Sequence, residues 1–132
     1  MDKIKIRGGN PMNGEMLISG AKNAGLPLMI TSLLSDQPVT LSNLPRLADV
    51  NMLNRILGNH GVDISVRGKQ HPDDSGFGER VTYHAANIVD TTAPYDMVSR
   101  MRASFWVLAP ILARMGEAKV SLPGGCLSLI HI

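Results

Sequence analysis

Alternation of apolar and polar residues dominates the first twenty positions of the chain. The run Lys3-Ile4-Lys5-Ile6-Arg7 alternates strictly, and Glu15-Met16-Leu17-Ile18-Ser19 is strand-like again after the turn signals Asn10-Pro11 and Asn13-Gly14. Period-two alternation is typical of a β-strand, and Asn-Pro and Asn-Gly pairs favour turns. The pattern therefore predicts a β-hairpin over residues 3–19.

Two later segments have the 3.6-residue periodicity of helices. The first covers residues 22–34 and is expected to begin at or just after Ala21, because Pro27 lies near its start, where a missing N–H is tolerated. The second covers residues 48–59 and has Gly61 just past its end. The apolar positions are Leu26, Met29, Ile30, Leu33 and Leu34 in the first helix and Val50, Leu53, Ile56 and Leu57 in the second.

Short apolar or β-branched runs predict strands between these helices, at residues 39–41, 62–66, 81–83 and 120–122. A polar stretch without periodicity, residues 68–79, is predicted to be a loop. The longest helical pattern is residues 95–115, with Pro110 as the expected kink. Strands and helices alternate in units of roughly thirty residues, which favours an α/β fold.

Composition narrows the class of protein. The 132 residues suffice for one domain, with 44% hydrophobic and 18% charged residues. The net charge of +2 and the small number of aromatic residues, one Trp, two Tyr and two Phe, do not indicate a nucleic-acid surface. The first residues lack the apolar core of a secretion signal, and the apolar stretches 26–34 and 105–112 are too short to span a bilayer. We therefore expect a cytoplasmic protein without a nucleic-acid or membrane partner.

The residues that bind metals in other proteins are scattered along this chain. The four histidines, His60, His71, His84 and His131, share no metal-ligand spacing, and Cys126 is the only cysteine. No metal site is predicted.

A candidate anion site lies where the first helix begins, in Ser19-Gly20-Ala21-Lys22-Asn23-Ala24. Helix N-termini present free N–H groups and a partial positive charge. The charge of Lys22 opposes this dipole, so its presence suggests that an anionic ligand compensates it. The alternative is a solvated surface lysine, since the segment lacks the full glycine pattern of a P-loop.

A second candidate is Arg102 in the motif Met101-Arg102-Ala103-Ser104. Trp106 follows four residues later and would share a helix face with Arg102, so that stacking could hold the guanidinium in place for a phosphate. The alternative is an ordinary solvated arginine.

The third candidate is Cys126, which follows Pro123-Gly124-Gly125. Glycines let the backbone approach a ligand closely, so the thiol could be presented at a loop tip as a catalytic group. The alternative is a small buried hydrophobe, because free cysteine is among the most buried residue types.

Four motifs occur together in this chain: Ser19-Gly20-Ala21-Lys22-Asn23-Ala24, Ala93-Pro94-Tyr95-Asp96, Met101-Arg102-Ala103-Ser104 and Ser121-Leu122-Pro123-Gly124-Gly125-Cys126. In this order they closely resemble the N-terminal part of the UDP-N-acetylglucosamine 1-carboxyvinyltransferase family, also called UDP-N-acetylglucosamine enolpyruvyl transferases. The resemblance covers residues 1–126. The shikimate-pathway relatives share the fold but lack the Gly-Gly-Cys loop.

The resemblance implies an enzyme of the first committed step of peptidoglycan synthesis. The family transfers the enolpyruvyl group of phosphoenolpyruvate to the 3-hydroxyl of UDP-N-acetylglucosamine and releases phosphate, without metal or organic cofactor. On the matching positions, Lys22 and Asn23 would hold phosphoenolpyruvate, Arg102 would contact the nucleotide sugar, and Cys126 would be the general acid and the target of fosfomycin, the family's covalent inhibitor.

The resemblance also implies an incomplete portion of the enolpyruvyl transferase-like α/β fold, in which each of two domains consists of repeated β-α-β-α-β-β units. Residues 1–20 would be a hairpin that belongs to the distal domain, and residues 21–126 would be part of the first domain. Without the C-terminal remainder of the enzyme, the chain is expected to be inactive alone. The alternative function is a non-catalytic module that binds a nucleotide sugar or phosphate.

The last six residues, 127–132, depart from the family. Their sequence, Leu-Ser-Leu-Ile-His-Ile, is what the sequencing-library adapter CTGTCTCTTATACACATC encodes in frame. We therefore expect a non-native tail and a truncated gene read.

Overall fold

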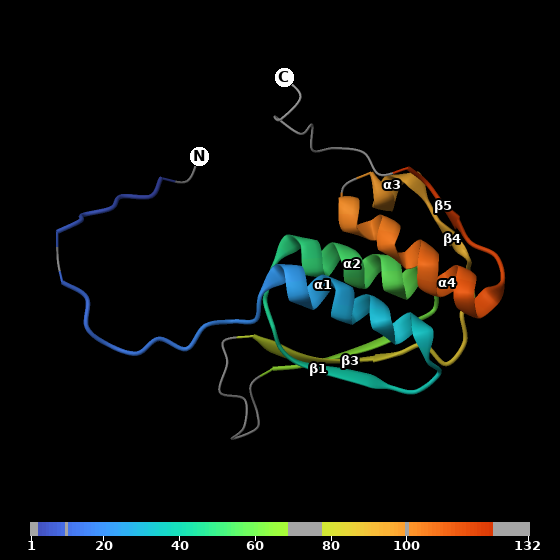
Figure 1. Ribbon diagram of the computed structural model, residues 1–132, viewed down its shortest axis with the longest axis horizontal. Coiled ribbons are helices and arrows are strands. Elements are labelled where there is room, and N and C mark those ends of the chain that lie inside the picture. Colours follow the sequence, from blue (N-terminus) through green and yellow to red (C-terminus); the bar gives the residue numbers. More distant parts are fainter. Residues whose placement is uncertain (1–2, 10, 69–77, 100, 123–132) are drawn as a thin grey trace.

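The computed structural model describes residues 3–9, 11–68, 78–99 and 101–122. Its body is a layer of helices packed on one face of a three-stranded sheet (Figure 1). Helices and strands are interspersed along the chain, so the predicted α/β fold class is confirmed. None of the helices formed by the described residues is long and apolar enough to cross a bilayer.

The sheet consists of β1 (Val39–Leu44), β2 (Asp63–Arg67) and β3 (Glu79–His84), in the order β1-β3-β2 with antiparallel pairs. Val39 pairs with Tyr83, and Leu41 pairs with Val81. Val81 and Tyr83 are fully buried, because alternate side chains of the middle strand point to the same face and pack under the helices. Three predicted strands are therefore confirmed here, each with slightly different ends.

The two helices predicted from periodicity pack on this sheet. Helix α1 (Lys22–Ile30) continues as the 3-10 turn η1 (Thr31–Leu34), and α2 spans Ala48–Asn59, the predicted bounds. The predicted apolar face of α2 is buried as expected: Val50, Leu53, Ile56 and Leu57. The amphipathic periodicity and the absence of an interior Pro therefore predicted the bounds and the buried face of α2 correctly.

The remaining elements extend the helical layer and add a small second sheet at one side of the body. The short strands β4 (Thr92–Ala93) and β5 (Lys119–Val120) pair in parallel. Between them lie α3 (Tyr95–Val98), η2 (Arg102–Val107) and α4 (Leu108–Met115). Helix α4 packs against η1, so this unit completes the core of the helical layer.

The prediction of one helix over residues 95–115 with a kink at Pro110 is wrong. Met101 is extended, with φ −152° and ψ 122°, and separates α3 from η2. The buried hydroxyl of Ser104 stabilises this break by donating to the carbonyl oxygens of Val98 and Met101. Pro110 lies in the first turn of α4, and it has no N–H to offer the Trp106 carbonyl of a continuous α-helix, consistent with the tighter turn before it.

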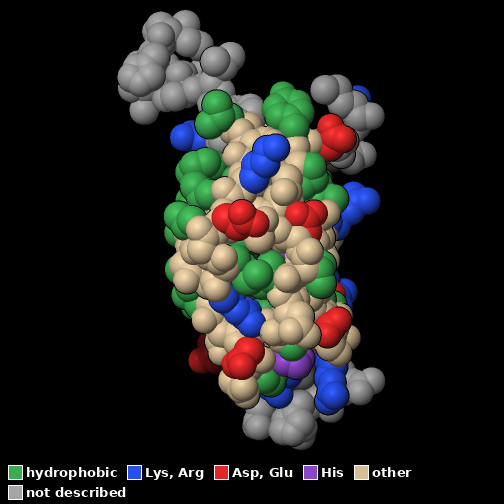
Figure 2. All heavy atoms as spheres, turned by 90° about the vertical axis from the view of Figure 1, so that its right-hand side faces the viewer, with side chains coloured by type: hydrophobic (Ala, Val, Ile, Leu, Met, Phe, Trp, Pro, Cys, Tyr) green, Lys and Arg blue, Asp and Glu red, His purple; other side chains and the backbone are tan. Residues whose placement is uncertain are grey.

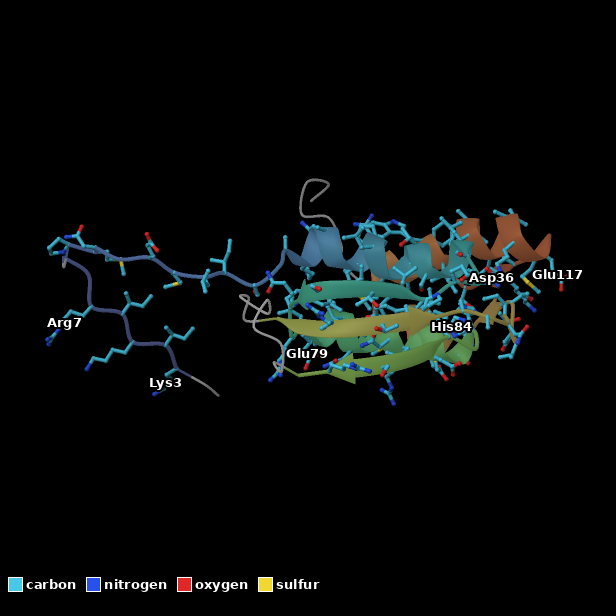
Figure 3. All side chains as sticks on the ribbon, turned by 90° about the horizontal axis from the view of Figure 1, so that it is seen from below. Lys3, Arg7, Asp36, Glu79, His84 and Glu117 are labelled. Atoms are coloured by element: carbon cyan, nitrogen blue, oxygen red, sulfur yellow. The ribbon has the colours of Figure 1, made fainter. Side chains whose placement is uncertain are left out.

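The prediction of an N-terminal β-hairpin is also wrong for this chain. Described residues 3–9 and 11–20 form no strand and run away from the body, with Lys3 and Arg7 far from the sheet (Figure 3). Ile4 is 89% exposed and Ile18 75% exposed. An isolated two-stranded hairpin is marginal in water, and no strand or helix among the described residues covers these apolar side chains.

The predicted loop at residues 68–79 lies mostly outside the described residues. Its last residue, Glu79, is already the first residue of β3, where it forms an ion pair of 2.9 Å with Arg46. The predicted strand 120–122 is shifted, since β5 covers Lys119–Val120.

Candidate functional site

The first candidate site lies at the N-terminus of α1. Ala21 is the N-cap residue and is extended, but its methyl group cannot accept a hydrogen bond from the first N–H groups of the helix. The residue before it, Gly20, donates its N–H to the Asn43 carbonyl across 3.0 Å. A Cβ at Gly20 would overlap this carbonyl oxygen, so the entry to α1 requires glycine.

Asn43 fixes this entry through side chain and backbone together. It takes the left-handed conformation with φ 59°, which asparagine tolerates better than most residues. Its Nδ2 donates to the carbonyl of Ile18 (3.4 Å), and its Oδ1 accepts from the N–H of Gly78 (3.1 Å). Asn43 therefore joins the end of β1, the approach to α1 and the start of β3.

Lys22 is the first residue of α1, as predicted. Its Nζ lies 2.9 Å from Asp49 Oδ2 in the first turn of α2, and the two side chains are 47% and 38% exposed. The pair can form because α1 and α2 pack side by side with their N-termini at the same end of the body (Figure 1). Asp49 thus supplies a negative partner for Lys22. From the sequence, this negative charge was expected to come from an anionic ligand.

Asn23 is exposed in the same first turn of α1. The α1 N–H groups, the Lys22 ammonium and the Asn23 amide thus gather donors at one exposed helix end. Such a set of donors suits an anion that carries several oxygen atoms.

Arg102 lies in the second candidate site, at the start of η2. It lines an open hollow of about 360 Å³ together with Ala103, Phe105, Trp106 and Leu122. Arg102 and Trp106 therefore share a surface, as predicted, although a 3-10 turn and not an α-helix brings them there. Trp106 is 49% exposed, so an apolar ring and a cation are both accessible in this hollow.

The two sites belong to one helical layer, since α1 packs against η2. Leu122 is the last described residue of the chain, and the third candidate, Cys126, lies outside the described residues together with its Pro-Gly-Gly loop. The structure therefore places Lys22, Asn23 and Arg102, and it leaves the position of Cys126 undescribed.

The described histidines have structural contacts. His60 is fully buried, and its Nδ1 donates to the Asp90 carbonyl across 2.7 Å. His84, at the far end of β3 from Glu79, donates from Nε2 to the Asp36 carbonyl across 3.0 Å (Figure 3). Within the described part of the chain, no group of three or more His, Cys, Asp or Glu residues could hold a metal ion.

The end of the body opposite the α1 N-terminus faces the viewer in Figure 2. It carries acidic and basic side chains interspersed with small apolar patches. Scattered apolar groups of this kind are normal for a solvated face. The N-terminus of α1, with its N–H groups, the Lys22 ammonium and the Asn23 amide, therefore remains the better candidate site.

Short-range sequence patterns missed two residues of this site, Asn43 and Asp49. Their contacts with Ile18, Gly78 and Lys22 join positions that are 25, 35 and 27 residues apart. The only available signal was the acidic residue in the first turn of a predicted helix, which the helix dipole explains equally well.

Known proteins of one kind resemble this chain over most of its length. UDP-N-acetylglucosamine 1-carboxyvinyltransferases from Chelativorans sp. (strain BNC1), Azorhizobium caulinodans and Brucella ovis are 66%, 67% and 64% identical to it over 126 residues. These alignments cover 96% of this chain and 29% of each relative, so the chain spans less than a third of the relatives' length.

A solved structure shares the fold. The enolpyruvyl transferase NikO from Streptomyces tendae superposes with a TM-score of 0.67 over 84% of this chain and 24% of its own, at 24% identity. A family model described as EPSP synthase (3-phosphoshikimate 1-carboxyvinyltransferase) matches residues 6–128. The chain therefore belongs to the EPSP synthase family, and the resemblance to UDP-N-acetylglucosamine 1-carboxyvinyltransferases predicted from its four motifs is confirmed.

Proposed function

We propose that this chain is the N-terminal part of an enzyme that transfers the enolpyruvyl group of phosphoenolpyruvate to the 3-hydroxyl of UDP-N-acetylglucosamine, with release of phosphate. The observation that carries the proposal is the 64–67% identity, over 96% of the chain, to relatives with the corresponding name. Because the chain spans 29% of these relatives, the activity belongs to the longer protein.

In this proposal Lys22 and Asn23 hold phosphoenolpyruvate at the N-terminus of α1. The phosphate of this substrate becomes the leaving group, so its charge must be neutralised as the reaction proceeds. An exposed ammonium and uncapped N–H groups at a helix N-terminus supply positive potential at that point. The geometry of this helix end supports the assignment.

Arg102 would contact the nucleotide sugar in the hollow of the second candidate site. The planar guanidinium suits phosphate oxygens, and the neighbouring Trp106 offers an apolar surface for a ring. A ligand that carries both a diphosphate and rings matches these two features.

Cys126 would be the general acid. Transfer of the enolpyruvyl group requires a proton on the enol carbon in the addition step, and a positioned thiol can donate it. The family resemblance alone supports this role. It also predicts that fosfomycin forms a covalent bond with the Cys126 sulfur in the full-length protein. Mass spectrometry of the peptide that contains Cys126 tests this, and an unmodified peptide after prolonged treatment would count against the assignment.

The domain arrangement follows from the same proposal. Residues 1–20 would pack in the distal domain of the full-length enzyme, which would explain their exposed apolar side chains in this chain. Residues 21–126 would form part of the first domain, and residues 127–132 would be a non-native tail. The enzyme would act in the cytoplasm, and its product would serve cell-wall synthesis, cell shape and cell division.

The decisive experiment uses the full-length protein. It is expressed from a coding sequence that includes residues 1–125 and continues without interruption beyond Gly125. We expect phosphate release that requires both phosphoenolpyruvate and UDP-N-acetylglucosamine, and a loss of at least about a hundredfold in Cys126→Ala. Release that does not depend on the nucleotide sugar would overturn the proposed reaction.

The 132-residue chain alone offers a second test. Since it spans 29% of its relatives, we expect no phosphate release from it. The alternative function for the isolated chain is a non-catalytic module that binds a nucleotide sugar or phosphate. Calorimetric titration with UDP-N-acetylglucosamine would detect such binding, and turnover by the isolated chain would contradict the expectation.

A further inference from the structure

We propose that Asp49 is a positioning residue for Lys22: its carboxylate holds the ammonium at the N-terminus of α1, where the phosphate of phosphoenolpyruvate would bind. This inference rests on the proposed function for its substrate. It adds a residue from another helix, 27 positions along the chain, to the proposed site.

The first argument is the conformational freedom of lysine. Its flexible four-carbon stem can place the ammonium in many positions, and the dipole of α1 repels a cation at this end of the helix. Asp49 Oδ2, 2.9 Å from Nζ, selects one position against that repulsion. The carboxylate is itself well placed, because the first turn of α2 favours a negative charge.

The second argument is that one connection fixes both partners. The segment from Asn43 to Asp49 joins β1 to α2 and contacts the α1 entry at its two ends. Asn43 accepts the N–H of Gly20 and donates to the Ile18 carbonyl, so it fixes the backbone before Lys22. Asp49 then fixes the tip of the Lys22 side chain. Backbone and ammonium are therefore held relative to the same short segment.

The third argument is that the ion pair leaves capacity for a ligand. An ammonium has three N–H donors, and the bond to Asp49 uses one. The Lys22 side chain is 47% exposed, so its other donors can reach a bound phosphate. Exposed ion pairs contribute little to folding stability. Loss of Asp49 should therefore affect substrate binding much more than folding.

The test compares Asp49→Ala and Asp49→Asn in the full-length protein. In Asp49→Ala the KM for phosphoenolpyruvate should rise roughly tenfold while the KM for UDP-N-acetylglucosamine stays within about twofold. Asp49→Asn should recover most of the loss, because its amide oxygen still accepts from the ammonium. Arg46→Ala is the matched control, since Arg46 lies on the same connection and its removal breaks another 2.9 Å ion pair, with Glu79. Its KM values should not change.

The outcomes separate this inference from the proposed function. If the wild-type protein is active and Asp49→Ala leaves the KM for phosphoenolpyruvate unchanged, positioning by Asp49 is wrong and the function stands. Equal losses in Asp49→Ala and Asp49→Asn would also overturn it, because only the charge on α2 would then matter. Urea denaturation of both variants checks that they are folded.

A second measurement does not depend on catalysis. In the 132-residue chain, acetic anhydride should acetylate Lys22 about two to five times faster in Asp49→Ala than in wild type, relative to the exposed Lys119. Arg46→Ala should leave this ratio unchanged. An unchanged ratio in Asp49→Ala would overturn the inference even if the wild-type full-length protein proved to lack enolpyruvyl transfer.

Discussion

The hydroxyl of Tyr83 donates a hydrogen bond to Asn54 Oδ1 across 2.9 Å and thereby joins the middle strand β3 to helix α2. The Tyr83 side chain is fully buried between these elements. Burial raises the pKa of the Tyr83 phenol, and the negative charge of Glu79 raises it further. The folded protein therefore holds this phenol proton more tightly than the unfolded chain does.

The raised pKa predicts that the protein loses stability in alkali. Between the ordinary tyrosine pKa of about 10 and the higher folded value, the folded state binds more protons than the unfolded state, so the free energy of unfolding falls as pH rises. The slope from this group is at most about 1.4 kcal/mol per pH unit. Below pH 10 the contribution is fully present.

Urea denaturation of wild type and Tyr83→Phe at pH 9 and pH 11 measures this slope. Tyr83→Phe should cost about 1 kcal/mol at pH 9, because Asn54 loses its donor, and should lose less stability than wild type between the two pH values. Tyr95→Phe is the control, since Tyr95 is exposed. An equal pH dependence in wild type and Tyr83→Phe would show that the phenol is not protected by the fold.

Arg114 links helix α4 to the end of η1 and to the segment after β3 through carbonyl groups. Its Nη1 donates to the carbonyls of Ser35 (3.0 Å) and Leu33 (3.4 Å), and its Nη2 donates to that of Ala86 (3.0 Å). Arg114→Ala should lower the free energy of unfolding by about 2–3 kcal/mol, because these carbonyls lose a charged donor. Arg114→Lys should lose about half as much, since an ammonium lacks the planar fork that spans the three acceptors.

The prediction for Arg114 is checked by chemical denaturation of the two Arg114 variants, with Arg67→Ala as the control. Arg67 ends β2 and is exposed, so its removal should change stability by less than about 0.5 kcal/mol. Equal midpoints for Arg114→Ala and Arg67→Ala would refute the structural role.

The parts of the fold that sequence predicted correctly are those in which local pattern and tertiary burial agree. In α2 the apolar period, the acidic first turn and the absence of Pro all favour the observed bounds. The segment 95–115 has equal periodicity, but the Ser104 hydroxyl and the extended Met101 interrupt it through contacts that no period reveals. The 3–19 alternation fails for another reason: an isolated hairpin is marginal in water, and no described strand or helix packs on residues 3–9 and 11–18.

The candidate site divides in the same way. The helix start at Lys22 follows from local signals, and so does the shared surface of Arg102 and Trp106. The Lys22–Asp49 pair depends on how two helices pack, which becomes visible only in three dimensions. Gly20 could be recognised as a turn residue, but the Asn43 carbonyl that excludes a Cβ there could not.

Ser104 should be required for the break between α3 and η2. Its hydroxyl is buried and donates to the Val98 carbonyl across 3.1 Å and to the Met101 carbonyl. We expect Ser104→Ala to cost about 1–2 kcal/mol and to accelerate amide hydrogen exchange in residues 102–107. Ser42→Ala, at an exposed position of β1, is the control. Unchanged exchange in Ser104→Ala would mean that packing alone holds Met101 in its extended conformation.

Two glycines, Gly20 and Gly58, should respond in opposite directions to the same substitution. Gly58 lies inside α2 with open space around the position of an added Cβ, so Gly58→Ala should stabilise the protein by about 0.5–1 kcal/mol through reduced freedom of the unfolded chain. At Gly20 the added Cβ would overlap the Asn43 carbonyl oxygen, and the chain could relieve this only by giving up the Gly20 N–H bond. We expect Gly20→Ala to displace the start of α1 and to cost about 1–3 kcal/mol.

Urea denaturation of Gly20→Ala and Gly58→Ala gives the two signs, and the acetylation rate of Lys22 reports the local effect. Lys22 should react faster in Gly20→Ala, because the displaced turn moves its ammonium away from Asp49, and at the wild-type rate in Gly58→Ala. If both variants stabilise the protein and leave Lys22 unchanged, the chain enters α1 by a path that does not require the close approach of Gly20 to Asn43.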